Sequence, residues 1–181
     1  MNTEDAINRV WTEVGDVLTQ GDAADVTALV DRLEQASHVF VAGQGRSGLI
    51  GKCFAMRIMH IGLSVYSVGE VVTPAIGPGA LLVAISGSGS TPVTLTVAQR
   101  ALAAGAKILL ISSRRASPIA RLAHHVLVLP AKAGESERAS IQPMGSLFDQ
   151  STHLLLDAVC VLLVQRLGRT MGDLRSRHTN L

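Results

Sequence analysis

Short apolar runs and helix-like segments alternate along most of the chain. Runs with the length and composition of buried strands cover residues 38–42, 65–68, 81–85, 107–111 and 126–129. Segments with helical character cover residues 47–61, 91–104, 118–123 and 146–167. Because a strand, a helix and a second parallel strand form a right-handed crossover unit, this rhythm predicts a five-stranded parallel sheet between two helical layers. The expected fold is a three-layer α-β-α sandwich of the α/β class.

Two amphipathic helices are expected before the first strand, over residues 4–19 and 23–35. Gly21 separates them, and Asp22 is suited to cap the second one. The sequence contains no internal repeat and no low-complexity linker. We therefore expect a single domain over residues 1–181, with the N-terminal helices in 1–36 and the α/β core, C-terminal helix and tail in 37–181.

The composition narrows the class of protein. Apolar residues make up 48% of the 181 residues and aromatic residues 3%, which suits a parallel sheet buried on both faces. A net charge of +2, with scattered basic residues, argues against a nucleic-acid partner. Cys53 and Cys160 are expected to be buried thiols in a reducing compartment, and no Cys/His cluster has metal-ligand spacing. With no apolar leader at the N-terminus, a cytoplasmic protein is predicted.

The segment 147–167 is the most apolar helix of the chain. Its apolar positions continue nearly all the way round the helix, which favours burial against the core and against another subunit. It is interrupted by four polar residues that a membrane-spanning helix rarely contains: Asp149, His153, Asp157 and Gln165. We expect a core helix at a subunit interface, and no membrane partner.

A loop of small hydroxyl residues follows the third predicted strand directly and precedes a helix. It consists of Ser86, Gly87, Ser88, Gly89, Ser90 and Thr91. Backbone amides can approach an anion closely there, and the helix dipole favours negative charge. The loop therefore predicts a phosphate cradle, with a flexible Gly/Ser turn as the alternative. It is not a Walker A loop, because no Gly-Lys-Ser/Thr follows.

Two more strand ends carry loops that would reach the same edge of the sheet, where ligands of such folds bind. Residues 43–48 contain Arg46 and Ser47, and residues 69–74 contain Glu70. The sequence GQGRSG in the first loop approaches a dinucleotide-binding motif. However, the expected acidic residue should follow about 20 residues on, whereas Glu70 lies later, and the cradle would then have no role. We prefer a phosphosugar, whose oxygens suit Arg46 and Ser47.

Asp149, His153 and Asp157 are spaced i, i+4 and i+8, so they lie along one helix face. Three interpretations stay open: a metal site, a relay in which His153 polarises Asp149, and simple pairing of His153 with Asp157 near an interface. For His153 and Asp157 we prefer simple pairing, and we expect no metal and no cofactor.

Three further residues have both structural and functional interpretations. Glu70 either braces its loop or acts in catalysis. His60 follows an apolar helical stretch, where a half-buried structural histidine is common. His178 lies near the C-terminus, where side chains are usually exposed. The remaining histidines flank strands and are interpreted as structural.

Several motifs together resemble the sugar isomerase (SIS) family, and within it the 6-phospho-3-hexuloisomerases. They are VAGQGRSGLIGKCFAMRIMHIG (41–62), VGEVVTP (68–74), ISGSGST (85–91), IQPMGSLFDQ (141–150) and RHTNL (177–181). The resemblance implies a flavodoxin-like SIS fold and a homotetramer that needs neither metal nor nucleotide. It also implies interconversion of D-arabino-hex-3-ulose 6-phosphate and fructose 6-phosphate through an enediol, a step of formaldehyde assimilation in the ribulose monophosphate pathway.

The resemblance assigns roles to the candidate residues. Ser47 and the loop of residues 86–91 would hold the phosphate or neighbouring hydroxyls, and His60 would belong to the site wall. Asp149 and His178 would lie nearest the chemistry, with Glu70 as a third candidate base. The tail could reach the site of a neighbouring subunit. Relatives usually carry Glu in place of Asp149.

Two other functions stay open at this point. One is a phosphosugar sensor without catalysis, and the other is a different isomerase, such as an arabinose 5-phosphate isomerase. Few basic residues precede the first strand, which argues against a repressor, and the PMGSLF and RHTNL motifs favour the hexulose enzyme. Residues 131–142, with Glu135, Glu137 and Arg138, are expected to be a solvated loop or a mobile lid.

Overall fold

Five parallel strands form the centre of the protein, in the order β2-β1-β3-β4-β5. The computed structural model describes residues 1–131 and 140–180. The strands are β1 (Val39–Gly43), β2 (Val65–Ser67), β3 (Leu81–Ile85), β4 (Lys107–Ser112) and β5 (His125–Val128). All five strands were predicted, with ends that differ by at most one residue. The predicted loop or lid of residues 131–142 lies mostly outside the described residues.

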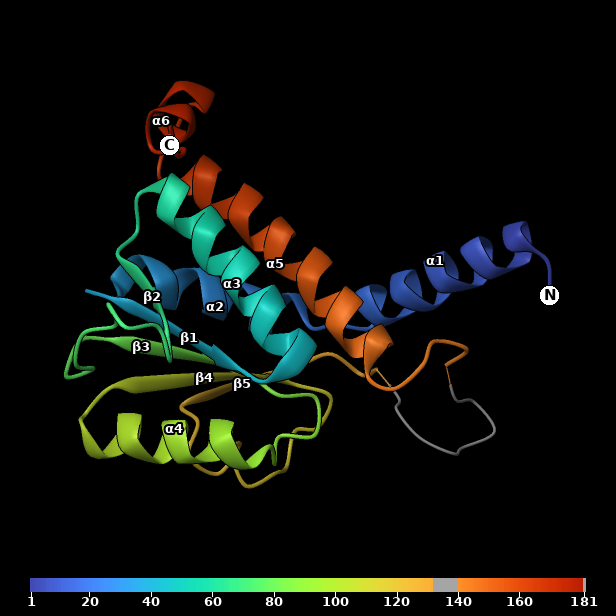
Figure 1. Cartoon of the computed structure of the whole chain (residues 1–181), viewed down its shortest axis with the longest axis horizontal. Coiled ribbons are helices and arrows are strands. Elements are labelled where there is room, and N and C mark those ends of the chain that lie inside the picture. Colours follow the sequence, from blue (N-terminus) through green and yellow to red (C-terminus); the bar gives the residue numbers. More distant parts are fainter. Residues whose placement is uncertain (132–139, 181) are drawn as a thin grey trace.

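Helices cover both faces of the sheet, which confirms the predicted three-layer fold (Figure 1). One layer contains α2 (Ala23–Gln35), α3 (Gly45–Ile61) and α5 (Ser146–Arg166), and the other contains α4 (Pro92–Ala103). Successive strand residues alternate between the two cores, as the pleat requires. On β1, Val41 packs under α3 and α5, whereas Phe40 packs on the side of α4.

The N-terminal helix α1 (Thr3–Thr19) begins at a capping box made by Asn2 and Asp5. Its C-terminal half buries Val14 and Val17 in the core next to α5, while its N-terminal half projects from the body (Figure 1). The predicted cap of α2 is confirmed, because the Asp22 side chain accepts a hydrogen bond from the amide of Ala24 at 2.8 Å.

The helix predicted over residues 118–123 is wrong: this segment consists of hydrogen-bonded turns. The amide of Ile119 donates to the carbonyl of Gly89 at 3.0 Å, and the amide of Ala120 donates to the Ser117 hydroxyl at 3.1 Å. These contacts tie the segment to the loop after β3 instead of letting a longer helix form. A short helix that was not predicted, α6 (Met171–Ser176), starts at a capping box of Thr170 and Asp173.

α5 is long and apolar enough, by length and composition alone, to cross a membrane. More than half of its most apolar window is buried inside the protein, where it packs against α1, α2 and α3. This is the environment of a core helix. Burial also raises the pKa of the Cys160 thiol on α5 to about 12. The prediction that both thiols are buried is wrong for Cys53, which is exposed on α3.

Candidate active site

The order of the strands opens a crevice at their carboxyl ends. β1 and β3 are neighbours, but β1 continues into α3 on one face and β3 continues into α4 on the other. A cavity of about 560 Å³ lies at this edge. It is lined by Ser47, Gly87, Ser88, Ser113, Arg114, Pro130, Ala131, Gly145, Phe148 and Asp149.

Four residues from the predicted site meet at this cavity: Ser47, Gly87, Ser88 and Asp149. They come from the start of α3, the loop after β3 and the start of α5. The structure therefore brings together residues from three distant parts of the sequence. Their roles in binding and chemistry stay predictions.

Asp149 is a buried carboxylate, with 7% of its surface exposed. Its Oδ1 accepts a hydrogen bond of 2.6 Å from the Ser47 hydroxyl. Burial raises the pKa of Asp149, and the Ser47 hydrogen bond and the positive charge of Arg46 oppose this rise without cancelling it. A carboxyl group with these properties is suited to proton transfer closer to neutral pH than an exposed aspartate.

The loop of residues 86–91 is a tight turn. The hydroxyls of Ser86 and Thr91 lie 2.8 Å apart, and the Ser90 hydroxyl donates to that of Ser88 at 3.0 Å. Gly89 has a φ of +64°, which L side chains rarely adopt, and its amide donates to the carbonyl of Ser86. The loop thus closes on itself and presents Gly87 and Ser88 to the cavity.

The last residue of β4 and the segment that follows it hold this loop in place through hydrogen bonds. Both the Ser112 hydroxyl and the amide of Ser113 donate to the carbonyl of Gly87, at 3.1 and 3.0 Å. A Cβ atom added to Gly89 would lie 2.1 Å from the Ser117 hydroxyl, and one added to Gly87 would lie 3.1 Å from the Phe148 ring. A loop that is fixed by these contacts does not behave as a flexible Gly/Ser linker.

Comparison with known proteins assigns the family. Residues 32–154 of the chain match the SIS domain. The chain belongs to the SIS family. A 3-hexulose-6-phosphate isomerase of Mycobacterium gastri is 39% identical, over 97% of this chain and 89% of its own. A protein of the same name from Methylomonas aminofaciens is also 39% identical, over 94% and 93% of the two chains.

A solved structure agrees with these relatives. It is a crystal structure of a protein from Methanococcus jannaschii for which a molecular function of 3-hexulose-6-phosphate isomerase is inferred. It superposes on this SIS chain with a TM-score of 0.86 and 33% identity, and covers 98% of this chain and 99% of that one.

Two predicted residues of the SIS motifs lie far from the cavity of the same chain. His60 is buried near the C-terminal end of α3, and the ring of His178 stacks on it with centroids 5.1 Å apart. At roughly 1.5 Å per residue, His60 lies about 20 Å along α3 from Ser47. Burial first, then the charges of His178 and Arg57, lowers the pKa of His60. Within one chain, the structure does not bring this pair to Asp149.

Other predicted residues shape the surroundings of the SIS cavity without lining it. Arg46 donates to the Ser146 hydroxyl at 3.1 Å, beside the start of α5. Glu70 is exposed and forms a 2.5 Å ion pair with Lys52 of α3. The other four residues of the predicted cradle are not among those that line the cavity: Ser86, Gly89, Ser90 and Thr91.

The three polar residues spaced along one face of α5, Asp149, His153 and Asp157, make two separate contacts. His153 Nε2 lies 3.6 Å from Asp157 Oδ2 on the exposed side, whereas Asp149 contacts Ser47 on the buried side. The geometry thus agrees with pairing of His153 and Asp157 and gives no support to the relay. Among residues 1–131 and 140–180, no group of three or more His, Cys, Asp or Glu side chains is arranged to hold a metal ion.

Sequence reasoning missed the contribution of the strand end at β4. Ser113 and Arg114 follow β4 and line the SIS cavity together with Ser88. The signal that could have found them is topological, because the carboxyl end of a central parallel strand reaches the same edge as those of its neighbours. Neither residue belongs to a motif with a recognisable spacing.

Proposed function

We propose that the protein is a 6-phospho-3-hexuloisomerase, which interconverts D-arabino-hex-3-ulose 6-phosphate and fructose 6-phosphate in formaldehyde assimilation by the ribulose monophosphate pathway. The observation that carries this proposal is the pairing of two features in one cavity. A buried carboxylate with a raised pKa, Asp149, lines the same cavity as the hydroxyl-rich loop that includes Ser88. The substrate in this proposal is taken from the names of the two SIS relatives at 39% identity.

The chemistry follows from this arrangement. In the hexulose phosphate the phosphate blocks O6, so the 3-ketone cannot close a five-membered ring and the substrate enters as an open chain. Asp149 removes the proton from C2 to give an enediolate, and O3 takes up a proton to form the 2,3-enediol. Loss of the proton from O2 and protonation at C3 then yield the 2-ketone of fructose 6-phosphate. The Ser47 hydroxyl fixes the orientation of the carboxylate through its 2.6 Å hydrogen bond. Hydrogen-bond donors that line the cavity steady the developing oxyanion.

The active unit is an oligomer, and we propose a tetramer. The outer sides of α3 and α5 expose apolar side chains, among them Leu49, Met56, Leu154 and Val161. Such a face suits a second copy of the chain. We propose that His178 of one copy reaches the cavity of another in this assembly, where it assists ring opening of fructose 6-phosphate. A phosphosugar substrate and two free thiols fit a cytoplasmic enzyme.

The deciding experiment measures turnover with EDTA present. Purified protein is mixed with hex-3-ulose 6-phosphate in deuterium oxide, and the product is followed by NMR. Formation of fructose 6-phosphate with deuterium at C3 is expected, because an enediol exchanges its proton with solvent. If the protein binds fructose 6-phosphate but shows no turnover, the result would favour a phosphosugar sensor without catalysis. If the protein instead converts arabinose 5-phosphate preferentially, the result would favour an arabinose 5-phosphate isomerase.

A further inference from the structure

We infer that Arg114 binds the phosphate group of the substrate and thereby sets the direction in which the phosphosugar lies. The identity of the ligand rests on the proposed function. Among the described residues that line the cavity, Arg114 carries the one positive charge and Asp149 the one negative charge. The cavity therefore has two poles, and the phosphosugar also has two distinct ends.

The backbone of Arg114 is tied to the cradle. Its amide donates to the Ser112 hydroxyl at 3.2 Å, and the same hydroxyl donates to the carbonyl of Gly87 at 3.1 Å. The adjacent amide of Ser113 donates to that carbonyl too, at 3.0 Å. These bonds fix Arg114 relative to Gly87 and Ser88, so its side chain starts from a defined position beside the loop.

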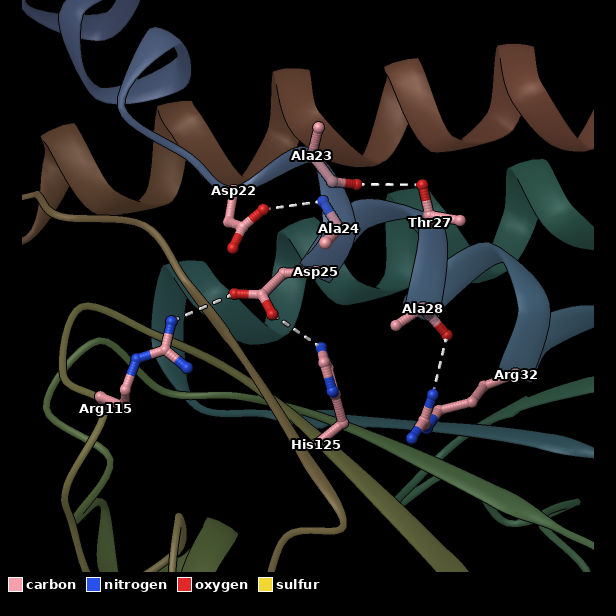
Figure 2. Close-up of polar contacts among 9 residues, drawn as sticks. All are labelled: Asp22, Ala23, Ala24, Asp25, Thr27, Ala28, Arg32, Arg115 and His125. Carbon is pink, nitrogen blue, oxygen red and sulfur yellow. Dashed lines mark hydrogen bonds and ion pairs between the residues drawn. The ribbon is translucent and has the colours of Figure 1, made fainter.

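The next residue is anchored in another direction. Arg115 points toward Asp25 of α2, and its Nη2 lies 3.4 Å from Asp25 Oδ2 (Figure 2). His125 of β5 approaches the other oxygen of Asp25, with Nε2 3.1 Å from Oδ1. Asp25 is buried, and Arg115 and His125 lie against its two oxygens. The two consecutive arginines thus differ: Arg115 joins the segment to α2, and Arg114 faces the cavity.

Within the part of the chain that the structure describes, the charge of Arg114 is not neutralised by a carboxylate. In residues 1–131 and 140–180, no carboxylate forms an ion pair with it. A guanidinium can form two parallel hydrogen bonds to phosphate oxygens, which a hydroxyl cannot do. The loop hydroxyls and amides then satisfy the remaining oxygens. With the phosphate held between Arg114 and Ser88, the distal carbons C2 and C3 extend toward Asp149.

The test is a binding measurement that does not depend on turnover. Isothermal calorimetry compares wild type with Arg114→Ala, Arg114→Lys and Arg121→Ala, using fructose 6-phosphate, inorganic phosphate and fructose. Arg121 is a matched control, because it is an exposed arginine of the same segment that does not line the cavity. Thermal melts of all variants verify that each one is folded.

Arg114→Ala is expected to lower the affinity for fructose 6-phosphate and for inorganic phosphate by about tenfold or more, because the charge-assisted hydrogen bonds are lost together with the charge. Arg114→Lys should be intermediate, because it keeps the charge and loses the planar fork. Arg121→Ala should match wild type, and fructose should show no dependence on residue 114. Equal affinities of wild type and a folded Arg114→Ala overturn the inference, even where turnover supports the proposed function. If binding depends on Arg114 but no turnover is seen, the inference about Arg114 holds and the proposed isomerase function is contradicted.

Discussion

The hydroxyl of Ser47 donates a 2.6 Å hydrogen bond to the carboxylate of Asp149, although 102 positions separate the two residues. The bond joins the first turns of α3 and α5 at the wall of the cavity. It holds one carboxylate oxygen and stabilises the ionised form, while burial disfavours that form. The proton affinity of the proposed base is therefore the balance of two local effects that can be changed separately.

Asp149→Asn is expected to lower kcat by at least about a hundredfold and leave fructose 6-phosphate affinity nearly unchanged. It should also keep or raise the melting temperature at neutral pH. Because folding raises the pKa of Asp149, its ionised form costs folding free energy; the cost is absent below the ordinary pKa and complete above the raised one. Parallel kinetics, calorimetry and melts check this prediction. Asp157→Asn, an exposed change on the same helix, is the control and should alter none of the three.

Ser47→Ala removes the hydrogen bond that opposes the effect of burial. The pKa of Asp149 should then rise further, so the acidic limb of the kcat profile should move to higher pH. The measurement is kcat between pH 5 and pH 9 for wild type and variant. Ser88→Ala serves for comparison, because Ser88 lines the cavity without a hydrogen bond to Asp149; it should raise KM and leave the limb in place. An unmoved limb in Ser47→Ala would remove Asp149 as the group that titrates.

The sequence was sufficient to predict the sheet and the edge at which the cavity lies. Apolar runs such as residues 81–85 and 107–111 are distinctive, and the carboxyl ends of parallel strands must share one edge. Ser47 and Ser88 could be assigned to one site for that reason. The same logic applied to β4 would have included Arg114.

Other features depend on packing that no local pattern encodes. The bond between Ser47 and Asp149 requires the relative rotation of α3 and α5, and the stacking of His60 on His178 requires the chain to fold back through α6. The failed helix at residues 118–123 has a similar cause, since the amide of Ile119 bonds to a distant loop. Tertiary contacts decided these positions, so sequence periodicity could not.

Co-expression of two inactive variants tests whether His178 acts across a subunit interface. Asp149→Asn and His178→Ala are each expected to have little activity alone. If every site takes Asp149 from one copy and His178 from another, random hybrids regain about a quarter of the wild-type sites. Hybrids are purified with two different tags and assayed for isomerisation. Hybrids as inactive as their parents would contradict a site shared between subunits, and an active His178→Ala parent would remove His178 from the reaction.

Gly89→Ala should disrupt the cradle. The residue has a φ of +64°, and a Cβ atom would lie 2.1 Å from the Ser117 hydroxyl. Strain and collision together should cost at least about 2 kcal/mol of unfolding free energy and weaken phosphate binding in the molecules that still fold. Urea denaturation and calorimetry measure the two effects. Gly77→Ala is the matched control, because a Cβ atom at Gly77 meets nothing within 4 Å; similar losses in both variants would contradict the role of the turn.

Glu13 of α1 anchors the segment that leads into the wall of the cavity at Gly145. Its carboxylate accepts from the Ser140 hydroxyl at 2.6 Å, the amide of Ile141 at 2.9 Å and the side chain of Gln142 at 3.1 Å. Burial alone would raise the pKa of Glu13, but these three bonds and the positive charge of Arg9 together outweigh it and hold the pKa below its ordinary value. The projecting N-terminal helix therefore supports the site that it does not line.

Glu13→Ala should cost about 1–2 kcal/mol, because three donors lose their acceptor, and it should raise KM more than it lowers kcat. The pH dependence of unfolding supplies a second readout. Because folding lowers the pKa of Glu13, its contribution to stability is present above the ordinary glutamate range and disappears as the pH falls through the lowered value. Glu13→Gln should lack that part of the acid-induced loss, whereas Glu4→Gln, an exposed change on the same helix, should retain it. Identical acid profiles for wild type and Glu13→Gln would show that the anchor does not depend on the charge.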